Sequence, residues 1–225
     1  MIDLLPTGHA RIATAAQLAR APRLDLISWC HATARYTIVT LELLEWLSTM
    51  IAGRWAIEIC AGQGDLGYHL GVPMSDSAMQ TGPEMQVLYK LMMQQTPTDP
   101  PPDVERMDAI AAVHKYRPRV VIGSWVTQLY KDGDEGPPKI GSSIYGVDEF
   151  EILRVCETYI HIGNLAVHKD KRILELPHDE YEFPWLWSRA QRPELNQIWV
   201  WNRPQIAAVL PPGDEPPPTD AGAAP

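Results

Sequence analysis

A short apolar segment that ends in glycines constrains the fold of this chain more than any other feature. Residues 56–60 (AIEIC) form an apolar run, and Ala61-Gly62-Gln63-Gly64 follows it directly. The pattern predicts a buried strand, a tight turn and a short helix. Glycines in such a turn let a ligand approach the backbone, and the helix N-terminus beyond offers free N–H groups. We therefore expect a ligand site outside the carboxyl end of this strand.

Apolar periodicity in the rest of the chain predicts an α/β protein. Apolar residues three and four apart indicate helices at 14–20, 24–35, 38–52, 109–116 and 148–157. Short apolar runs indicate seven strands, at 56–60, 72–75, 104–107, 120–122, 159–162, 171–176 and 197–201. The early strands alternate with helices and are expected to be parallel and buried. The last two have no obvious helix between them and are expected to form an antiparallel pair.

Composition favours one globular domain followed by a tail. The chain has 225 residues, of which 45% are hydrophobic, so it can bury a sizeable core. We expect N-terminal helices packing on the core at 1–53, the sheet domain at 54–203 and a Pro-rich flexible tail at 204–225. Residues 131–143, rich in glycine and charge, are expected to form a mobile loop.

The charge balance narrows the choice of partners. Asp and Glu number 28 against 19 Lys and Arg, a net charge of −9, which disfavours general binding to nucleic acid or anionic lipid. Neither an apolar run long enough to span a membrane nor a signal-peptide pattern occurs, so a cytoplasmic protein is expected. Four histidines of the second half match no zinc spacing, so hydrogen-bonded or surface histidines are expected and no metal site: His114, His161, His168 and His178.

Two acidic residues follow strand candidates and could contact a nucleoside. Asp76 ends the second candidate, where its carboxylate could accept hydrogen bonds from both ribose hydroxyls; the alternative is a cap on the next helix. Asp108 ends the third, where it could accept a hydrogen bond from an adenine amino group, with Met107 against the ring. An N-cap of helix 109–116 is an equally good reading of Asp108.

The glycines also satisfy G-x-G-x-x-G, through Gly62, Gly64 and Gly67. That motif would suit a nicotinamide-dependent oxidoreductase, which expects an acidic residue about 20 positions further on. Asp76 is only 14 beyond Gly62. The oxidoreductase is therefore an alternative rather than the leading hypothesis, as is a non-catalytic nucleoside-binding or interaction module.

Taken in order, these features resemble the class I S-adenosylmethionine-dependent methyltransferases. The segment 41–64 resembles the first motif of that family and its preceding helix, and residues 120–125 (VVIGSW) fall where the fourth strand and active-site motif belong. The resemblance covers roughly 36–202. It implies a Rossmann-like, doubly wound seven-stranded sheet with a reversed last strand, and S-adenosylmethionine as cofactor. The cofactor-binding residues that it implies are Tyr36, Glu58, Ala61, Gly62, Gln63, Gly64, Asp76, Ser77, Met107, Asp108, Ala109 and Ser124.

The chain departs from this family in ways that leave the methyl acceptor unidentified. The helix after the glycine turn is short, since Asp76 lies 12 positions after Gly64, and the fourth-strand motif is Gly-Ser-Trp-Val. The Asp/Asn-Pro-Pro-aromatic motif of amino-group DNA methyltransferases and the Pro-Cys of cytosine-C5 enzymes are absent. A small molecule or a protein is therefore a better acceptor candidate than DNA.

Three residues are candidates for the catalytic step, which needs position and exclusion of water more than specific chemistry. Trp125 could form a wall of the acceptor pocket, since an aromatic face attracts a methyl-bearing cation, or it could be a packed core residue. Tyr130 and Glu149 could orient the acceptor or remove a proton. Arg189 and Arg192 could hold an anionic substrate, although solvated surface charges are favoured for both.

Overall fold

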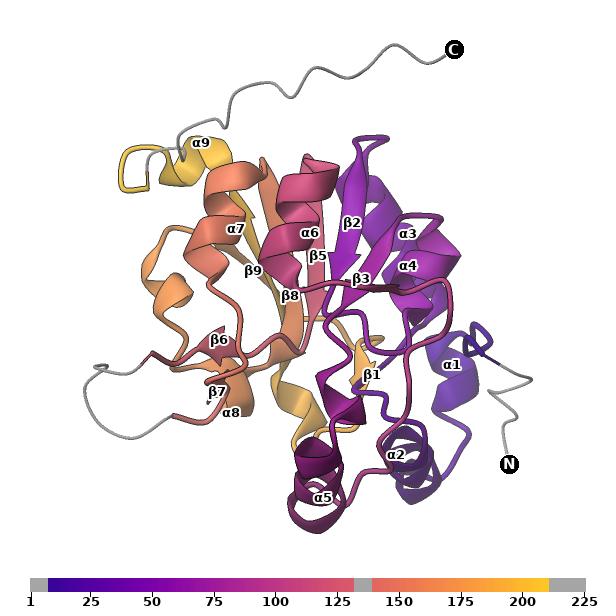
Figure 1. Ribbon diagram of the computed structural model, residues 1–225. Coiled ribbons are helices and arrows are strands. Elements are labelled where there is room, and N and C mark those ends of the chain that lie inside the picture. The colour runs from indigo at the N-terminus through magenta and orange to yellow at the C-terminus, as the bar shows by residue number, and fades with distance from the viewer. Residues whose placement is uncertain (1–7, 132–138, 211–225) are drawn as a thin grey trace, which may run out of the picture.

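A seven-stranded sheet forms the centre of the molecule (Figure 1). The computed structural model describes residues 8–131 and 139–210. The first five strands across the sheet are parallel, whereas β11 is antiparallel to both of its neighbours. The protein is thus a Rossmann-like α/β protein with a reversed last strand, as predicted. Across the sheet the order is β4 (Glu105–Arg106), β3 (Met74–Asp76), β2 (Ala56–Ile59), β5 (Val120–Ser124), β8 (Thr158–Asn164), β11 (Asn196–Asn202) and β9 (Asp179–Tyr181).

Helices pack on both faces of the sheet, because successive side chains of a strand point to opposite sides. Ile57 and Ile59 of β2 lie in one core cluster with α6 (Ala109–Tyr116) and α7 (Glu149–Val155). Ala56 lies in a second cluster with α3 (Leu41–Ile51) and α4 (Asp65–Leu70). Every residue of β2 and β8 is buried, which explains why these strands read as nearly continuous apolar runs.

The N-terminal segment forms a smaller cluster beside the sheet. α1 (Ala15–Leu18) and α2 (Arg23–Ala32) pack there with Ile38. Residues Thr37–Ile38 form β1, which pairs with β10 (Trp187–Ser188), so the helix predicted from residue 38 begins only at Leu41, where Thr40 caps it. This pairing brings the chain around Tyr36 next to the chain around Arg189, two segments far apart in sequence.

Two expectations for the C-terminal third differ from the structure. The strand predicted at 171–176 is wrong: the segment contains a 3-10 helix, η2 (Arg172–Glu175), because Lys171 turns inward to a buried ion pair with Glu149. The seventh strand is β9 instead. Residues 204–210, predicted as the start of the tail, instead continue the packed structure: α9 (Arg203–Ile206) and the residues after it place Ile206 and Leu210 in the core. Residues 211–225 lie outside the described residues.

One helix, α5 (Pro83–Met92), does not pack on the sheet. It connects β3 to β4 but buries none of its residues, and it lies with α2 at one end of the molecule (Figure 1). Of the predicted loop at 131–143, residues 132–138 lie outside the described part. The remaining elements are η1 (Met79–Thr81), β6 (Gln128–Leu129), β7 (Ser142–Ser143), α8 (Leu165–His168) and η3 (Pro193–Leu195).

Candidate functional site

A cavity of about 890 Å³ opens at the carboxyl ends of the central strands. Its lining includes Gly62 after β2, Asp76 at the end of β3, Ser124 at the end of β5 and Asn164 at the end of β8. This edge is where open α/β sheets bind their ligands, and the volume suits a small molecule. A cavity therefore lies at the place where the glycine turn predicts a ligand site.

The glycines of the turn have different tasks. Gly62 has a φ of +55°, and a Cβ built on it would meet no atom within 4 Å. Gly64 has a φ of +67°, but its Cβ would lie 2.7 Å from both Met74 Sδ and Val104 Cγ2. Gly64 therefore permits close packing, whereas Gly62 keeps the backbone open at the cavity. Ala61 and Gln63, which precede and follow Gly62 in the chain, also line the cavity.

Asp76 is fixed against this turn by backbone hydrogen bonds. Its Oδ2 accepts a hydrogen bond from Gly62 N at 2.8 Å, and its Oδ1 accepts one from Ala78 N at 2.7 Å. A carboxylate has about four acceptor positions, so two remain for a ligand. Ser77 lines the cavity beside it. A ligand with neighbouring hydroxyls would meet an acceptor whose orientation is set before binding.

Glu58 holds the helix α4, which follows the glycine turn. Its side chain is buried, and Oε2 accepts a hydrogen bond from Gly67 N in the first turn of α4 at 2.7 Å. Burial raises the pKa of this carboxyl from 4.5 to about 8, against the lowering effect of the Gly67 hydrogen bond. Glu58 lines the cavity, and its contacts give it the role of holding α4 in place.

Aromatic side chains form another part of the wall. The ring centroid of Trp125 lies 5.5 Å from that of Tyr36 and 5.4 Å from that of His168, and all three residues line the cavity. Thr37 Oγ1 and Ser124 Oγ are 2.9 Å apart, which joins the chain after Tyr36 to the end of β5. Tyr36, Ser124 and Trp125, predicted from distant parts of the sequence, are thus brought together.

His168 is a cavity residue that sequence reasoning did not select. Its Nδ1 lies 3.1 Å from the backbone N of Asn164, and its Nε2 is buried without a hydrogen-bond partner among residues 8–131 and 139–210. Burial, aided by the charge of Lys171, lowers its pKa from 6.5 to about 3. The ring is therefore neutral near pH 7. α8 follows β8 directly and contacts it, which places His168 near the carboxyl end of that strand, where it lines the cavity.

Arg189 is a second cavity residue, and the expectation of a solvated surface charge is wrong for it. The side chain is buried, and its Cζ lies 3.5 Å from the centroid of the Tyr36 ring. Its Nη1 donates to Gln95 Oε1 at 2.6 Å. Arg192 also lines the cavity, but it is exposed and pairs with Glu194 at 3.0 Å. The β1–β10 pairing, invisible in the sequence, accounts for the difference.

Five predicted residues do not line the cavity. Asp108 accepts a hydrogen bond from Ala111 N at 2.9 Å, so its side chain has the role of an N-cap for α6. Met107 and Ala109 pack with the core of the α6 face. Tyr130 continues β6, where its N–H donates to Ser143 O. The fifth, Glu149, is buried in the interior.

Glu149 belongs to a buried polar cluster behind the cavity. Its Oε1 accepts hydrogen bonds from Lys171 Nζ at 2.7 Å and from Tyr159 OH at 2.8 Å. Burial lowers the pKa of Lys171, and Glu149 opposes that shift. Lys171 Nζ also donates to Val126 O at 2.8 Å. Because Val126 follows Trp125, the ion pair supports the cavity wall rather than contacting a ligand.

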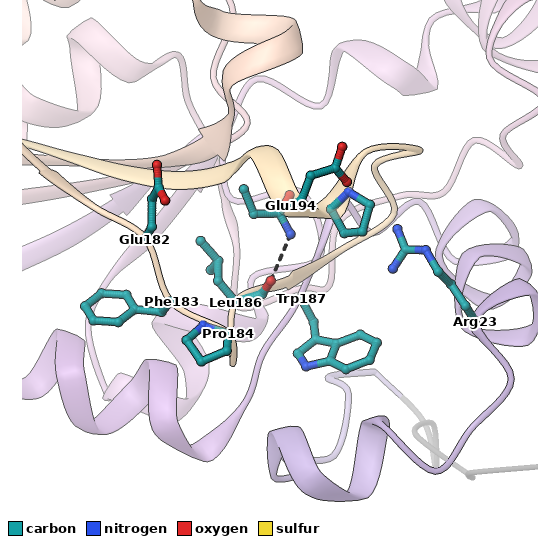
Figure 2. Close-up of a pocket in the computed structure, with 9 residues that line it drawn as sticks. Arg23, Glu182, Phe183, Pro184, Leu186, Trp187 and Glu194 are labelled. Carbon is teal, nitrogen blue, oxygen red and sulfur yellow. Dashed lines mark hydrogen bonds between the residues drawn. The ribbon is translucent and has the colours of Figure 1, made fainter.

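A second cavity, of about 500 Å³, lies between α2 and the segment after β9 (Figure 2). Arg23, Phe183, Trp187 and Glu194 line it, and Asn196 Nδ2 donates to Leu186 O at 2.8 Å across it. The Arg23 guanidinium donates to Ala190 O. Among the described residues that line this second cavity there is no glycine, whereas a glycine turn lines the larger one.

Neither a metal centre nor a membrane span is found in the described residues. In ranges 8–131 and 139–210, no three His, Cys, Asp or Glu side chains gather in a way that could hold a metal ion. Among these same residues, no helix is long and apolar enough to cross a membrane.

Comparison with known proteins adds little to this site. No family model matches the sequence, and no curated protein matches it. Among solved structures, Thermoplasma acidophilum 1320 aligns with a TM-score of 0.34 and 13% identity, over 80% of this chain and 95% of that one. The "putative RNA methyltransferase PH1948" of Pyrococcus horikoshii aligns with a TM-score of 0.32 and 15% identity, over 71% and 79%. TM-scores this low support no conclusion about the activity of this chain.

Proposed function

We propose that this protein transfers a methyl group from S-adenosylmethionine to an acceptor bound in the same cavity. The contact between Gly62 and Asp76 carries the proposal. It sets a side-chain-free stretch of backbone beside an oriented carboxylate, at the carboxyl ends of parallel strands. The spare acceptor positions of Asp76 suit the two ribose hydroxyls of a nucleoside.

The other end of the cavity suits the sulfonium group of this cofactor. Trp125 presents an aromatic ring there, beside the Tyr36 ring on which Arg189 already lies, and an aromatic ring attracts a cation by about 0.5–2 kcal/mol. When bound, S-adenosylmethionine supplies an electrophilic methyl group. The residues of the chain would then align the acceptor with that methyl and exclude water.

Proton handling in this proposal differs from the sequence-based expectation. Glu149 and Tyr130 do not line the cavity, so neither is proposed to remove a proton. His168 does line it, but a pKa lowered to about 3 makes its ring a poor proton acceptor. We assign His168 the orientation of the acceptor by a hydrogen bond. The acceptor would then arrive with a free lone pair or lose its proton to solvent.

Calorimetric titration with S-adenosylmethionine, S-adenosylhomocysteine and NAD tests the proposal. We expect micromolar affinity for the first two and none for NAD. Gly62→Val should abolish binding, because its side chain would fill the cavity. Gly53→Val is the matched control: Gly53 also has a positive φ, +72°, and open space around its Cβ position, but it does not line the cavity. Binding of NAD alone, or of none of the three, would overturn the proposal.

A further inference from the structure

Arg189 is a buried cation that no acid in the described part of the chain neutralises. Its side chain is 8% exposed, and arginine is rarely buried so deeply without an anionic partner. Within ranges 8–131 and 139–210, its contacts are the Gln95 amide oxygen, at 2.6 Å, and the face of the Tyr36 ring. Both are neutral groups. The positive charge of the guanidinium and some of its N–H donors therefore have no partner among the described residues.

Every carboxyl group that lines the cavity already has its own partner. Asp65 pairs with Arg35 and accepts the Ala10 N–H. Asp76 accepts two backbone N–H groups, and Glu58 accepts one, as described above. None of these acids pairs with the guanidinium of Arg189. Among the described residues, no lining acid is therefore left for Arg189, and an anionic group of a molecule that enters the cavity would supply the charge that it lacks.

The rim of the same cavity is apolar although solvent reaches it. Five of its lining residues are large hydrophobic side chains that are exposed, from α5 and the segment after the loop: Leu88, Met92, Met93, Ile140 and Tyr145. Exposed apolar surface gathered around one opening is typical of a ligand site. A ligand with an apolar body and an anionic end would satisfy both the rim and Arg189.

We propose that Arg189, seated on the Tyr36 ring, is the carboxylate-binding residue of this cavity. A guanidinium matches a carboxylate by two parallel hydrogen bonds, and stacking on an aromatic ring holds its plane. The carboxylate has two possible sources. One is the amino-acid part of S-adenosylmethionine, which rests on the proposed function; the other is an apolar methyl acceptor that carries a carboxylate.

Two ligand pairs, in each of which one member lacks the carboxylate, separate these sources. The first pair is S-adenosylhomocysteine and 5′-methylthioadenosine, which lacks the amino-acid group. The second pair is benzoate and its neutral analogue benzamide. Affinities are measured by calorimetry for the wild-type protein, Arg189→Gln and Arg189→Lys, with Arg192→Gln as the control in the same cavity. Arg189→Lys keeps a positive charge and serves as the test variant if Arg189→Gln does not fold.

We expect Arg189→Gln to weaken one carboxylate ligand at least 10-fold and its carboxylate-free analogue less than 2-fold. Arg189→Lys should fall between, and Arg192→Gln should change neither ligand. An effect on S-adenosylhomocysteine assigns the carboxylate to the cofactor, and an effect on benzoate assigns it to the acceptor. If neither pair responds to Arg189, the inference is overturned. If no nucleoside binds but benzoate still depends on Arg189, the proposed function fails while this inference stands.

Discussion

The two ends of the cavity differ in how completely their polar groups are paired. At the glycine end, the carboxyl groups of Asp76 and Glu58 both accept backbone hydrogen bonds at 2.7–2.8 Å. At the aromatic end, Trp125 Nε1 and His168 Nε2 are buried without hydrogen-bond partners, and Arg189 lacks an acidic partner among the described residues.

This difference indicates two kinds of ligand contact. An end whose carboxyl groups are already oriented by backbone hydrogen bonds binds a fixed chemical group with little rearrangement. Buried polar groups without partners cost about 1–3 kcal/mol each, so their retention needs a reason beyond folding. We interpret the glycine end as the seat of the nucleoside and the aromatic end as a surface that the ligand completes.

Breaking the ion pair between Lys171 and Glu149, behind the aromatic end, should have the largest effect on the stability of the protein. Lys171→Met leaves Glu149 buried without its cation and frees the Val126 carbonyl. We expect the free energy of unfolding to fall by about 3–5 kcal/mol, measured by urea denaturation.

The control for this prediction is Lys131→Met, which removes an exposed pair with Asp148. Its cost should stay below about 1 kcal/mol. Equal effects of the two substitutions would show that the buried ion pair does not support the cavity wall.

Changing the carboxylate at the glycine end should affect binding next most strongly. Asp76→Asn keeps the size of the side chain but removes the charge that would accept the ribose hydroxyls. The affinity for S-adenosylhomocysteine should fall by about 1.5–3 kcal/mol, roughly 10- to 150-fold.

Asp108→Asn is the matched change outside the cavity, where the side chain caps α6. Calorimetry should find its affinity unchanged. If Asp108→Asn weakened binding and Asp76→Asn did not, the nucleoside would have to lie elsewhere along the sheet edge.

The smallest expected effect, counted per pH unit, is the change in stability caused by the titration of Glu58. Its pKa is about 8 in the folded protein and 4.5 as the ordinary value, so the unfolded chain loses this proton first. The contribution of Glu58 to stability is therefore present in acid and is lost as pH rises from about 4.5 to about 8.

Glu58→Gln cannot titrate, yet its amide oxygen can still accept the Gly67 hydrogen bond. We expect the variant to gain stability over the wild type as pH rises from 5 to 8, by at most about 1.4 kcal/mol per unit. Thermal denaturation of both proteins across this range measures the difference, because other titrations cancel. A constant difference would mean that Glu58 is ionised throughout.

Much of the sheet was predictable because its strands are short, buried and bounded by turns. The apolar runs at 56–60, 120–122 and 197–201 correspond to the strands β2, β5 and β11 of the structure. The error at 171–176 has a plain cause: the apolar residues of a half-buried 3-10 helix and of a strand look alike over six positions. Lys171 was the discordant residue, and its burial beside Glu149 follows from a contact 22 positions away in sequence.

At the cavity, sequence reasoning identified those lining residues whose positions follow from local chain geometry. The glycine turn and Asp76 are set by a strand end and the two or three residues after it. Sequence reasoning favoured a surface position for Arg189 and did not select His168 for the cavity. The surroundings of these two residues come from the β1–β10 pairing and from α8. Asp108 was ambiguous because a helix cap and a ligand contact need the same residue at the same place.

The sequence by itself determined the alternation of strands and helices, the strand-end turn and hence the edge of the sheet where a ligand can bind. Hydrophobic periodicity and glycine conformation act over a few residues, so they can be read along the chain. Only the tertiary structure decided which charges are buried there. Whether Arg189 meets water, an acid or the Tyr36 ring depends on segments some 150 residues apart, and burial and pairing, not residue type, decide what a charge does.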